Sequence, residues 1–166
     1  GMSPLPVPLT ALEAATFPDN IDAQSVPMGG EIVGAAAEDR FTLVVEAQAD
    51  PSGAYLDRVQ IVKGWINASG ETEERVFDVA WAGSERERAD GSLAPVGSSV
   101  DIATGMTSNT IGEPSLRTVW QDPEFNRSES AFYYARVLQI PTARHSLLDK
   151  LALGDNTLDT RRPDTI

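Results

Sequence analysis

The chain contains no cysteine and a single histidine among its 166 residues. The missing thiols exclude disulfides, thiolate nucleophiles, zinc ribbons and cysteine-ligated iron–sulfur clusters. One histidine with carboxylates is a weak ligand set for zinc or iron, so we expect no metal held by this chain. Because the absence of cysteine is compatible with both cytoplasm and periplasm, the compartment stays open.

Basic residues are also scarce, since 13 Lys and Arg face 25 Asp and Glu for a net charge of −12. Nucleic acid and anionic membranes both attract cationic surfaces, so we expect neither as a partner. No apolar run approaches the roughly 18–20 residues of a membrane-spanning helix. Gly1 before Met2 resembles a tag-cleavage scar, and the following residues lack the basic start of a signal peptide. If the natural protein is exported, we expect its signal upstream of this chain.

Glycine and proline are frequent, with 13 and 11 residues, and several short runs alternate apolar with polar residues. This combination is typical of a β-rich domain with many turns. We therefore expect an all-β fold, an antiparallel β-sandwich of about seven strands with a short C-terminal helix and an irregular N-terminal arm. The expected parts are an arm with a short helix (1–30), the sandwich (31–142), and a helix with a tail (143–166).

Residues 54–83 are expected to form a long β-hairpin. If Asn67 pairs with Glu71, the loop has three residues and ends at Gly70, where a positive φ favours glycine. In this register Arg58 and Asp78 lie diagonally across the strands and form a weak ion pair if exposed. One face then carries the large apolar side chains Val59, Ile61, Trp65, Phe77, Val79 and Trp81.

Alternating or apolar patterns predict four further strands, over residues 40–49, 100–102, 116–121 and 131–140. The first precedes the hairpin across an Asp-Pro-Ser-Gly turn, which predicts a three-stranded meander. Ser146 is the expected N-cap of a final helix that ends at Gly154. A long hydrophilic loop, residues 84–99, follows the hairpin and is expected to be functional, covering or mobile.

His145 is the one histidine on which a catalytic triad or a metal site would depend. A Ser-His-Asp triad is conceivable, but no nucleophile-elbow motif accompanies it. A metal site needs several convergent ligands, which the sequence does not place beside this residue. We interpret His145 as a surface residue flanking the final helix.

Turn carboxylates are candidates for a calcium site or an acid–base pair, namely Asp50, Asp90, Asp101, Asp122 and Glu124. None has the spacing of an EF-hand calcium loop. Asp-Pro and Asp-Gly are ordinary turn sequences, so we favour turn formation for all five. Gly29-Gly30 lacks the other glycines and the basic residue of a phosphate-binding loop, and we interpret it as a turn as well.

A platform for stacking sugars is the alternative to core packing for Trp65, Trp81, Trp120, Tyr133 and Tyr134. Their positions on strands favour core packing. Lys63 and Arg136 interrupt apolar faces, and each is expected to extend its charge to solvent or to pair with a carboxylate. We therefore assign no catalytic, cofactor-binding or metal-binding residue and expect no cofactor.

Seven segments occur in an order that resembles one known family. They are VPMGGEI (26–32), LDRVQIVKGW (56–65), VFDVAWAG (76–83), ADGSLAPVGSSVD (89–101), SNTIGEPSL (108–116), VWQDPEF (119–125) and AFYYARVLQIPT (131–142). Together they resemble the C-terminal region of a large bacterial family, the domain of unknown function 3604. The resemblance spans roughly residues 26–142, which is most of the chain.

The resemblance implies that full-length relatives are metal-dependent hydrolases. Their N-terminal part carries His-x-His motifs similar to those of the polymerase-and-histidinol-phosphatase (PHP) phosphoesterases. This chain contains no such motif, so no residue role carries over. His145 departs from the family pattern, which has an aromatic residue there, and the pattern continues beyond Ile166 with a further strand. If that strand is absent, we expect an open sheet edge and a homodimer formed through it.

Three functions are consistent with these observations. The first is a non-catalytic β-sandwich segment of a larger PHP-like hydrolase, with a catalytic domain encoded upstream, so that this chain alone is not an enzyme. The second is a stand-alone binding module, with carbohydrate as the candidate ligand. The third is a segment whose loop, residues 84–99, completes an active site supplied by another domain.

Overall fold

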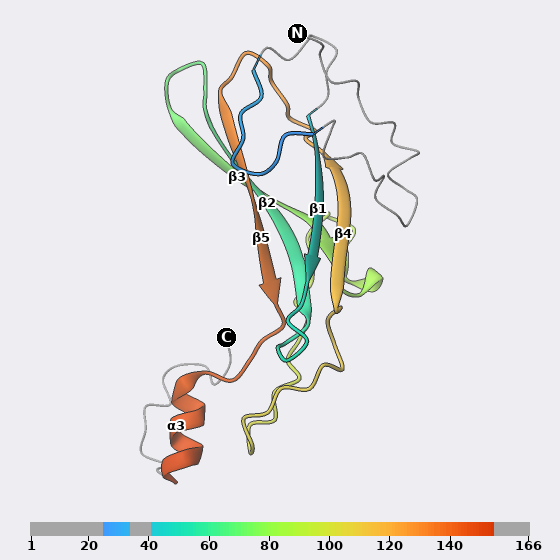
Figure 1. Ribbon diagram of the computed structural model, residues 1–166, viewed down its shortest axis with the longest axis vertical. Helices are drawn as coiled ribbons and strands as arrows, with labels where there is room; N and C mark the ends of the chain where they lie inside the picture. Colours follow the sequence, from blue (N-terminus) through green and yellow to red (C-terminus); the bar gives the residue numbers. More distant parts are fainter. Residues whose placement is uncertain (1–24, 34–40, 155–166) are drawn as a thin grey trace. The chain divides into compact units, whose positions relative to one another are not determined.

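The computed structural model describes residues 25–33 and 41–154. These residues form mainly β-structure, which confirms the predicted class (Figure 1). In chain order the elements are β1 (Thr42–Gln48), β2 (Leu56–Ile66), β3 (Thr72–Trp81), the short 3-10 helix η1 (Ser84–Arg86), β4 (Ser115–Gln121), β5 (Ala131–Gln139) and α3 (His145–Leu153). The described residues thus contain five strands where about seven were predicted. The short helix expected in the N-terminal arm, from Ala11 to about Ala15, lies outside them.

The strands form two sheets, one of β1 and β4 and one with the order β3-β2-β5. The predicted meander is therefore wrong in one pairing, because β1 does not join the hairpin. Both edges of β2 are occupied by β3 and β5, which leaves no place for β1 beside it. After β1 the backbone turns toward the segment before β4, where Ala49 N–H donates to Pro114 O at 2.8 Å.

The hairpin has the predicted loop register. Asn67 N–H donates to Glu71 O at 2.9 Å, and Gly70 has a φ of 80°. The Asn67 side chain stabilises the turn, because its Oδ1 accepts the backbone N–H groups of Ser69 and Glu71. Asparagine and glycine thus fix the turn through local chemistry, and the loop sets which side chains of β2 and β3 share a face.

The chain divides into two compact units, one of residues 1–45, 63–75 and 119–134 and the other of 46–62, 76–118 and 135–166. The second unit contains the most deeply buried aliphatic side chains, which are Val59, Ile61, Val62, Ile140 and Leu147. Of these, Val59, Ile61 and Val62 lie on β2, the central strand of its sheet. The first unit instead buries a lysine, Lys63, with 2 % of its surface exposed.

The final helix, α3, begins two residues earlier than predicted. Its N-cap is Arg144, which has extended backbone, and the Arg144 carbonyl accepts the N–H groups of Leu147 and Leu148. Ser146 therefore lies inside the helix and is not its cap. Gly154 ends the helix in the left-handed conformation, with φ 62°, as predicted.

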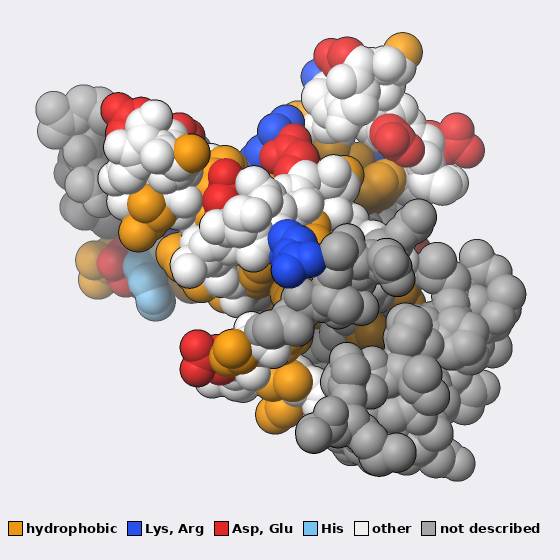
Figure 2. All heavy atoms as spheres, turned by 90° about the horizontal axis from the view of Figure 1, so that it is seen from above, with side chains coloured by type: hydrophobic (Ala, Val, Ile, Leu, Met, Phe, Trp, Pro, Cys, Tyr) orange, Lys and Arg blue, Asp and Glu red, His pale blue; other side chains and the backbone are white. Residues whose placement is uncertain are grey.

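The strand expected at residues 100–102 is reduced to a single bridge between Val100 and Thr107. Acidic side chains are spread over the face seen in Figure 2 rather than gathered in one patch. Across residues 25–33 and 41–154, no helix has both the length and the hydropathy needed to cross a membrane.

Candidate functional site

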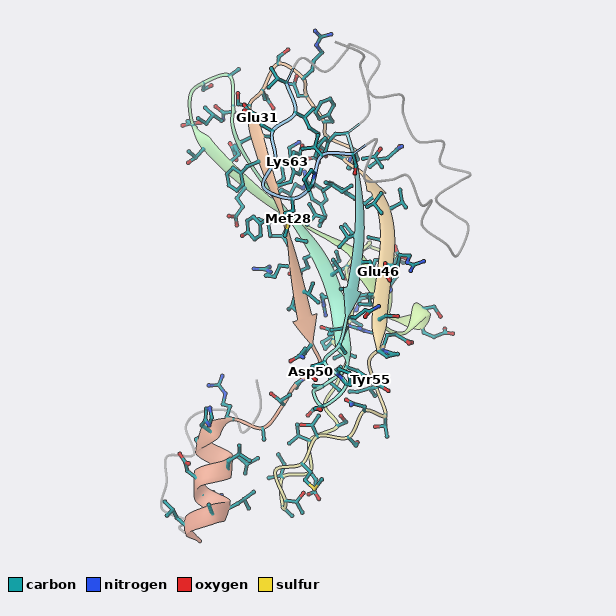
Figure 3. All side chains as sticks on the ribbon, in the orientation of Figure 1. Met28, Glu31, Glu46, Asp50, Tyr55 and Lys63 are labelled. Atoms are coloured by element: carbon teal, nitrogen blue, oxygen red, sulfur yellow. The ribbon has the colours of Figure 1, made fainter. Side chains whose placement is uncertain are left out.

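The most unusual group in the described residues is the buried ammonium of Lys63 on β2, labelled in Figure 3. Its Nζ donates to Asp122 Oδ2 at 2.6 Å and to the Glu124 carbonyl oxygen at 2.7 Å. Two aromatic rings flank the same nitrogen, with centroids 5.1 Å away in Trp65 and 5.7 Å away in Tyr133. The charge is therefore compensated by a carboxylate, a carbonyl dipole and two π faces.

Asp122 follows β4 directly, and its side chain is fully buried. Its Oδ2 also accepts the Tyr133 hydroxyl at 2.6 Å, while its Oδ1 accepts Glu124 N–H at 2.8 Å. The second bond is the usual way in which an aspartate before proline closes a turn. Both carboxylate oxygens are thus engaged, one by the turn and one by side chains from β2 and β5.

The surroundings shift the pKa values of Asp122 and Tyr133 in opposite directions. Burial acts to raise the pKa of Asp122, but hydrogen bonds from Lys63, Tyr133 and Glu124 N–H and the lysine charge outweigh it and leave the pKa lowered. Burial, with the hydrogen bond to the Asp122 carboxylate and its charge, raises the pKa of Tyr133 far above its ordinary value. Asp122 is therefore an anion and Tyr133 a neutral donor at neutral pH.

Aromatic packing closes the cluster on the Tyr133 side. The Phe41 ring stacks on Tyr133 with centroids 4.3 Å apart and on Phe125 with centroids 5.9 Å apart. Phe41 also accepts Asp122 N–H through its backbone carbonyl. An ammonium whose hydrogen bonds go to Asp122 and to the Glu124 carbonyl is not positioned to act as a nucleophile or base. The arrangement fits a structural ion pair, which was one of the two outcomes expected for Lys63.

A second polar network lies in the other unit. Arg58 donates to Asp57 Oδ2 at 2.8 Å and to Asp78 Oδ2 at 3.3 Å, so the predicted diagonal contact with Asp78 is present. Gln60 donates to Asp78 Oδ1 at 2.8 Å and accepts from Arg136 Nε at 2.8 Å. Arg136 is exposed and bonds to an amide, so it forms no buried ion pair. The network connects the three strands of one sheet through their side chains.

Arg86 anchors the loop of residues 84–99. Its guanidinium donates to the carbonyls of Ala82 and Ala94, and its Nη2 lies 2.7 Å from Asp57 Oδ1. The latter geometry is that of an ion pair without a well-aligned hydrogen bond, since Asp57 Oδ1 has no hydrogen-bond partner. Glu87 and Leu93 bridge within the loop. The loop is thus tied down by one arginine and its own pairing.

A small open hollow of about 240 Å³ lies beside this anchor, lined by Ala82, Gly83, Arg86, Val96, Ile111, Gly112 and Glu113. It is smaller than the roughly 300–1,000 Å³ of typical ligand pockets. The one arginine in its lining is already bound to Asp57 and to backbone carbonyls. The hollow therefore offers few groups for recognising a ligand.

The five candidate carboxylates do not converge. Asp50, Asp90 and Asp101 each accept a backbone N–H two residues later, as turn-forming aspartates do. Hydrogen bonds from Ser92 lower the pKa of Asp90, and the Ala103 N–H chiefly lowers that of Asp101. Within residues 25–33 and 41–154, no three His, Asp or Glu side chains come together as a metal-binding group.

His145 lies exposed at the start of α3, and a histidine side chain is visible at the surface in Figure 2. Gly29 and Gly30 form a turn, in which Gly30 N–H donates to Pro27 O. Both positions agree with the interpretation made from the sequence.

The five aromatic residues considered as a sugar-stacking platform differ in their exposure to solvent. Trp65, Trp81, Trp120 and Tyr133 are half-buried, and only Tyr134 is exposed. The exposed aromatic pair is Tyr134 with Phe132, whose rings are nearly parallel at 6° with centroids 6.4 Å apart. Sequence reasoning missed Phe132, although its spacing of two from Tyr134 on a strand was the available signal.

Comparison of the chain with known protein families agrees with the resemblance of the seven sequence segments. A family model described as "Protein of unknown function (DUF3604)" matches residues 7–166. No curated protein and no solved structure matches the chain. Because the family match covers almost the whole sequence, this chain belongs to the DUF3604 family.

Proposed function

We propose that this chain is a non-catalytic β-domain of a larger PHP-like metal-dependent hydrolase, in which it supports a catalytic domain encoded upstream. The observation that carries the proposal is the saturation of the buried polar cluster. The Lys63 ammonium, both oxygens of Asp122 and the Tyr133 hydroxyl all bind partners within the chain. Catalytic groups need a free lone pair or proton aimed at substrate, whereas these groups are used in packing.

We also propose that the two sheets pack against each other as a β-sandwich. Lys63 comes from the sheet of β2, and Asp122 directly follows β4 of the other sheet. Phe41, which precedes β1, stacks on Tyr133 of β5. Contacts of this kind between residues of two sheets support face-to-face packing, in which inner faces share one core.

Hydrolysis assays with the chain alone test the absence of catalysis. A general phosphomonoester and a phosphodiester are incubated with the chain and with Zn²⁺, Mn²⁺ or Mg²⁺. We expect no turnover above the metal blank. Turnover that scales with protein and disappears in Asp122→Asn, with folding confirmed by circular dichroism, would overturn the proposal.

The upstream DNA tests the supporting role. We expect a reading frame that encodes a domain with His-x-His motifs, joined to this chain in one polypeptide. Deleting residues 41–154 from that polypeptide is then expected to lower its thermal stability. A catalytic domain that keeps its full stability and activity without them would argue against a supporting role.

A carbohydrate-binding module is the second candidate, favoured by the exposed parallel rings of Phe132 and Tyr134. Flat exposed rings on one strand can stack on the apolar face of a pyranose. Glycan-array binding that is lost in Phe132→Ala and Tyr134→Ala, and kept in the half-buried control Trp65→Phe, would favour this function.

The third candidate is the contribution of residues 84–99 to a neighbouring active site. Glu85, Glu87 and Asp90 of this loop are exposed, but Arg86 points its guanidinium back to Asp57 and two backbone carbonyls. In the full polypeptide, Glu85→Gln, Glu87→Gln and Asp90→Asn are expected to lower kcat if the loop completes the site, and to leave it unchanged if the loop only covers the domain.

A further inference from the structure

The two outer strands of the β3-β2-β5 sheet have very different edges. β3 carries four charges, at Glu73, Glu74, Arg75 and Asp78, and charged side chains protect an edge against pairing with another chain. β5 has nine residues with Arg136 as its one charge and no proline or glycine. Within the described residues it pairs with β2 alone. Among the described residues, β5 therefore forms the less protected edge of this sheet.

The register shows which backbone groups of β5 are available. Asn67 N–H bonds to Glu71 O, and Asp57 O accepts Ala82 N–H. Between Asp57 and Asn67, alternation therefore directs odd-numbered β2 residues toward β3 and even-numbered ones toward β5. Gln60 accepts a hydrogen bond from Arg136, and a Cβ at Gly64 would clash with Phe132 Cζ. Both contacts fit one register, in which Gln60 lies opposite Arg136 and Gly64 opposite Phe132. Even-numbered β5 residues therefore bond to β2, and odd-numbered ones, including Ala135, present their N–H and C=O groups at the free edge.

The β5 sequence is complementary to itself in an antiparallel pairing centred on Ala135, the middle residue of the strand. Phe132 then lies opposite Leu138 of the second copy, and Tyr134 lies opposite Arg136. No like charges lie directly opposite each other, and each guanidinium meets an aromatic ring. The small alanine at the two-fold axis allows close approach, and the odd-numbered residues supply about ten backbone hydrogen bonds.

We propose that β5 is an interaction surface for a second copy of this chain, which pairs antiparallel through its own β5 about Ala135. The pairing joins two three-stranded sheets into one continuous sheet. The exposed edge of β5 becomes hydrogen-bonded in the dimer, and the buried cluster around Lys63 takes no part in the interface. The inference goes beyond the proposed function, because it holds for a supporting domain and for a binding module alike.

Cysteine substitution tests this geometry directly, since the chain has no cysteine of its own. Opposed hydrogen-bonded residues of antiparallel strands have Cα atoms about 5.5 Å apart, which suits a disulfide. We expect Ala135→Cys to form an intermolecular disulfide with oxidised glutathione. Ala80→Cys is the matched control, because Ala80 is half-buried like Ala135 and lies on β3, the charged outer strand of the same sheet. Equal cross-linking of both variants, or none in Ala135→Cys, would overturn the proposal.

Charge substitution tests the register without oxidation. Tyr134→Arg places an arginine opposite Arg136 of the second copy and is expected to shift the dimer toward monomer in sedimentation velocity runs. Adding Arg136→Glu restores an opposite-charge pair and is expected to restore the dimer. A loss of dimer in both variants contradicts the register. A wild-type chain that stays monomeric at its highest soluble concentration contradicts the interface itself.

Discussion

Lys63 and Asp122 are 59 positions apart in the chain and meet at 2.6 Å with side chains that are 3 % and 0 % exposed. Each charge has lost its water, and only the partner and the surrounding hydrogen bonds compensate for that loss. The pair connects the middle of β2 to the turn after β4, so it positions two segments that local sequence does not bring together. Removing one partner leaves the other as an isolated buried charge.

Lys63→Met is expected to lower the free energy of unfolding by about 3–5 kcal/mol, because Asp122 then stays buried without its cation. Lys63→Met combined with Asp122→Leu is expected to cost less than Lys63→Met alone, since no unpaired charge remains. Urea unfolding followed by circular dichroism measures both. Glu46→Gln is the control, because its exposed pair with Arg117 contributes less than about 1 kcal/mol. Equal losses in Lys63→Met and Glu46→Gln would contradict the role assigned to the buried pair.

Acid is expected to destabilise the fold through Asp122. The pKa of Asp122 is lowered in the folded state. The stability that this carboxylate contributes is therefore fully present above its unfolded pKa of about 3.9, and it is lost as the pH falls through its folded pKa. The urea midpoint of the wild type should therefore fall steeply below about pH 4. Asp122→Asn is expected to be less stable at neutral pH but to show a flatter acid dependence. An unchanged acid slope in that variant would argue against this assignment.

Alkali is expected to destabilise the fold through Tyr133. Its pKa is raised in the folded state, so the unfolded chain releases a proton from about pH 10 while the folded chain retains it. Stability should therefore decrease as pH rises above about 10. Tyr133→Phe removes a hydrogen bond to a charged acceptor and should cost about 1.5–3 kcal/mol at neutral pH. It should also weaken the alkaline decline, as followed by tyrosinate absorbance and fluorescence.

Gly112 is expected to tolerate no side chain. Its φ is 83°, and a Cβ there would lie 2.7 Å from Ile140 Cγ2 and 2.9 Å from Tyr55 Cβ. Gly112→Ala therefore combines left-handed strain with overpacking and should cost roughly 2–4 kcal/mol. Gly97→Ala is the matched control, because Gly97 has φ 88° but no atom within 4 Å. Thermal unfolding should separate the two, and equal losses would show that the contacts around Gly112 contribute nothing.

Arg86→Met is expected to release the loop of residues 84–99. The variant loses the bonds to the Ala82 and Ala94 carbonyls and leaves Asp57 buried without its second arginine. A protease that cuts after glutamate should then cleave at Glu85 or Glu87 faster than in the wild type. Arg88→Met removes the same charge from an exposed position in the loop and should leave the cleavage rate unchanged. Similar rates in both variants would contradict the anchoring role of Arg86.

Local chemistry made part of the fold predictable. Asn67 and Gly70 specify the hairpin loop, and once the loop is fixed the two-residue period places Val59 and Ile61 on the buried face. The alternation in β5 and the glycine at position 154 gave the last strand and the helix end in the same way. Each of these features depends on neighbours within a few residues.

The pairing of β1 with β4 was not predictable from such signals. Any strand of suitable pattern can pair with any other, and the choice depended on β5 occupying the second edge of β2. The start of α3 was also missed, because the extended backbone of Arg144 supplied the N-terminal turn instead of the Ser146 hydroxyl. In the candidate site, Lys63 and Asp122 were each identified, but their contact required the full fold.

The sequence by itself determined the β-rich class, the hairpin register, the acidic character and membership of the DUF3604 family, since these follow from composition, short-range patterns and the order of segments. The tertiary structure decided that Lys63, Asp122 and Tyr133 form one closed cluster and that β5, within the described residues, pairs with β2 alone. Both depend on which distant segments share a sheet, and that choice is made by burial over the whole chain.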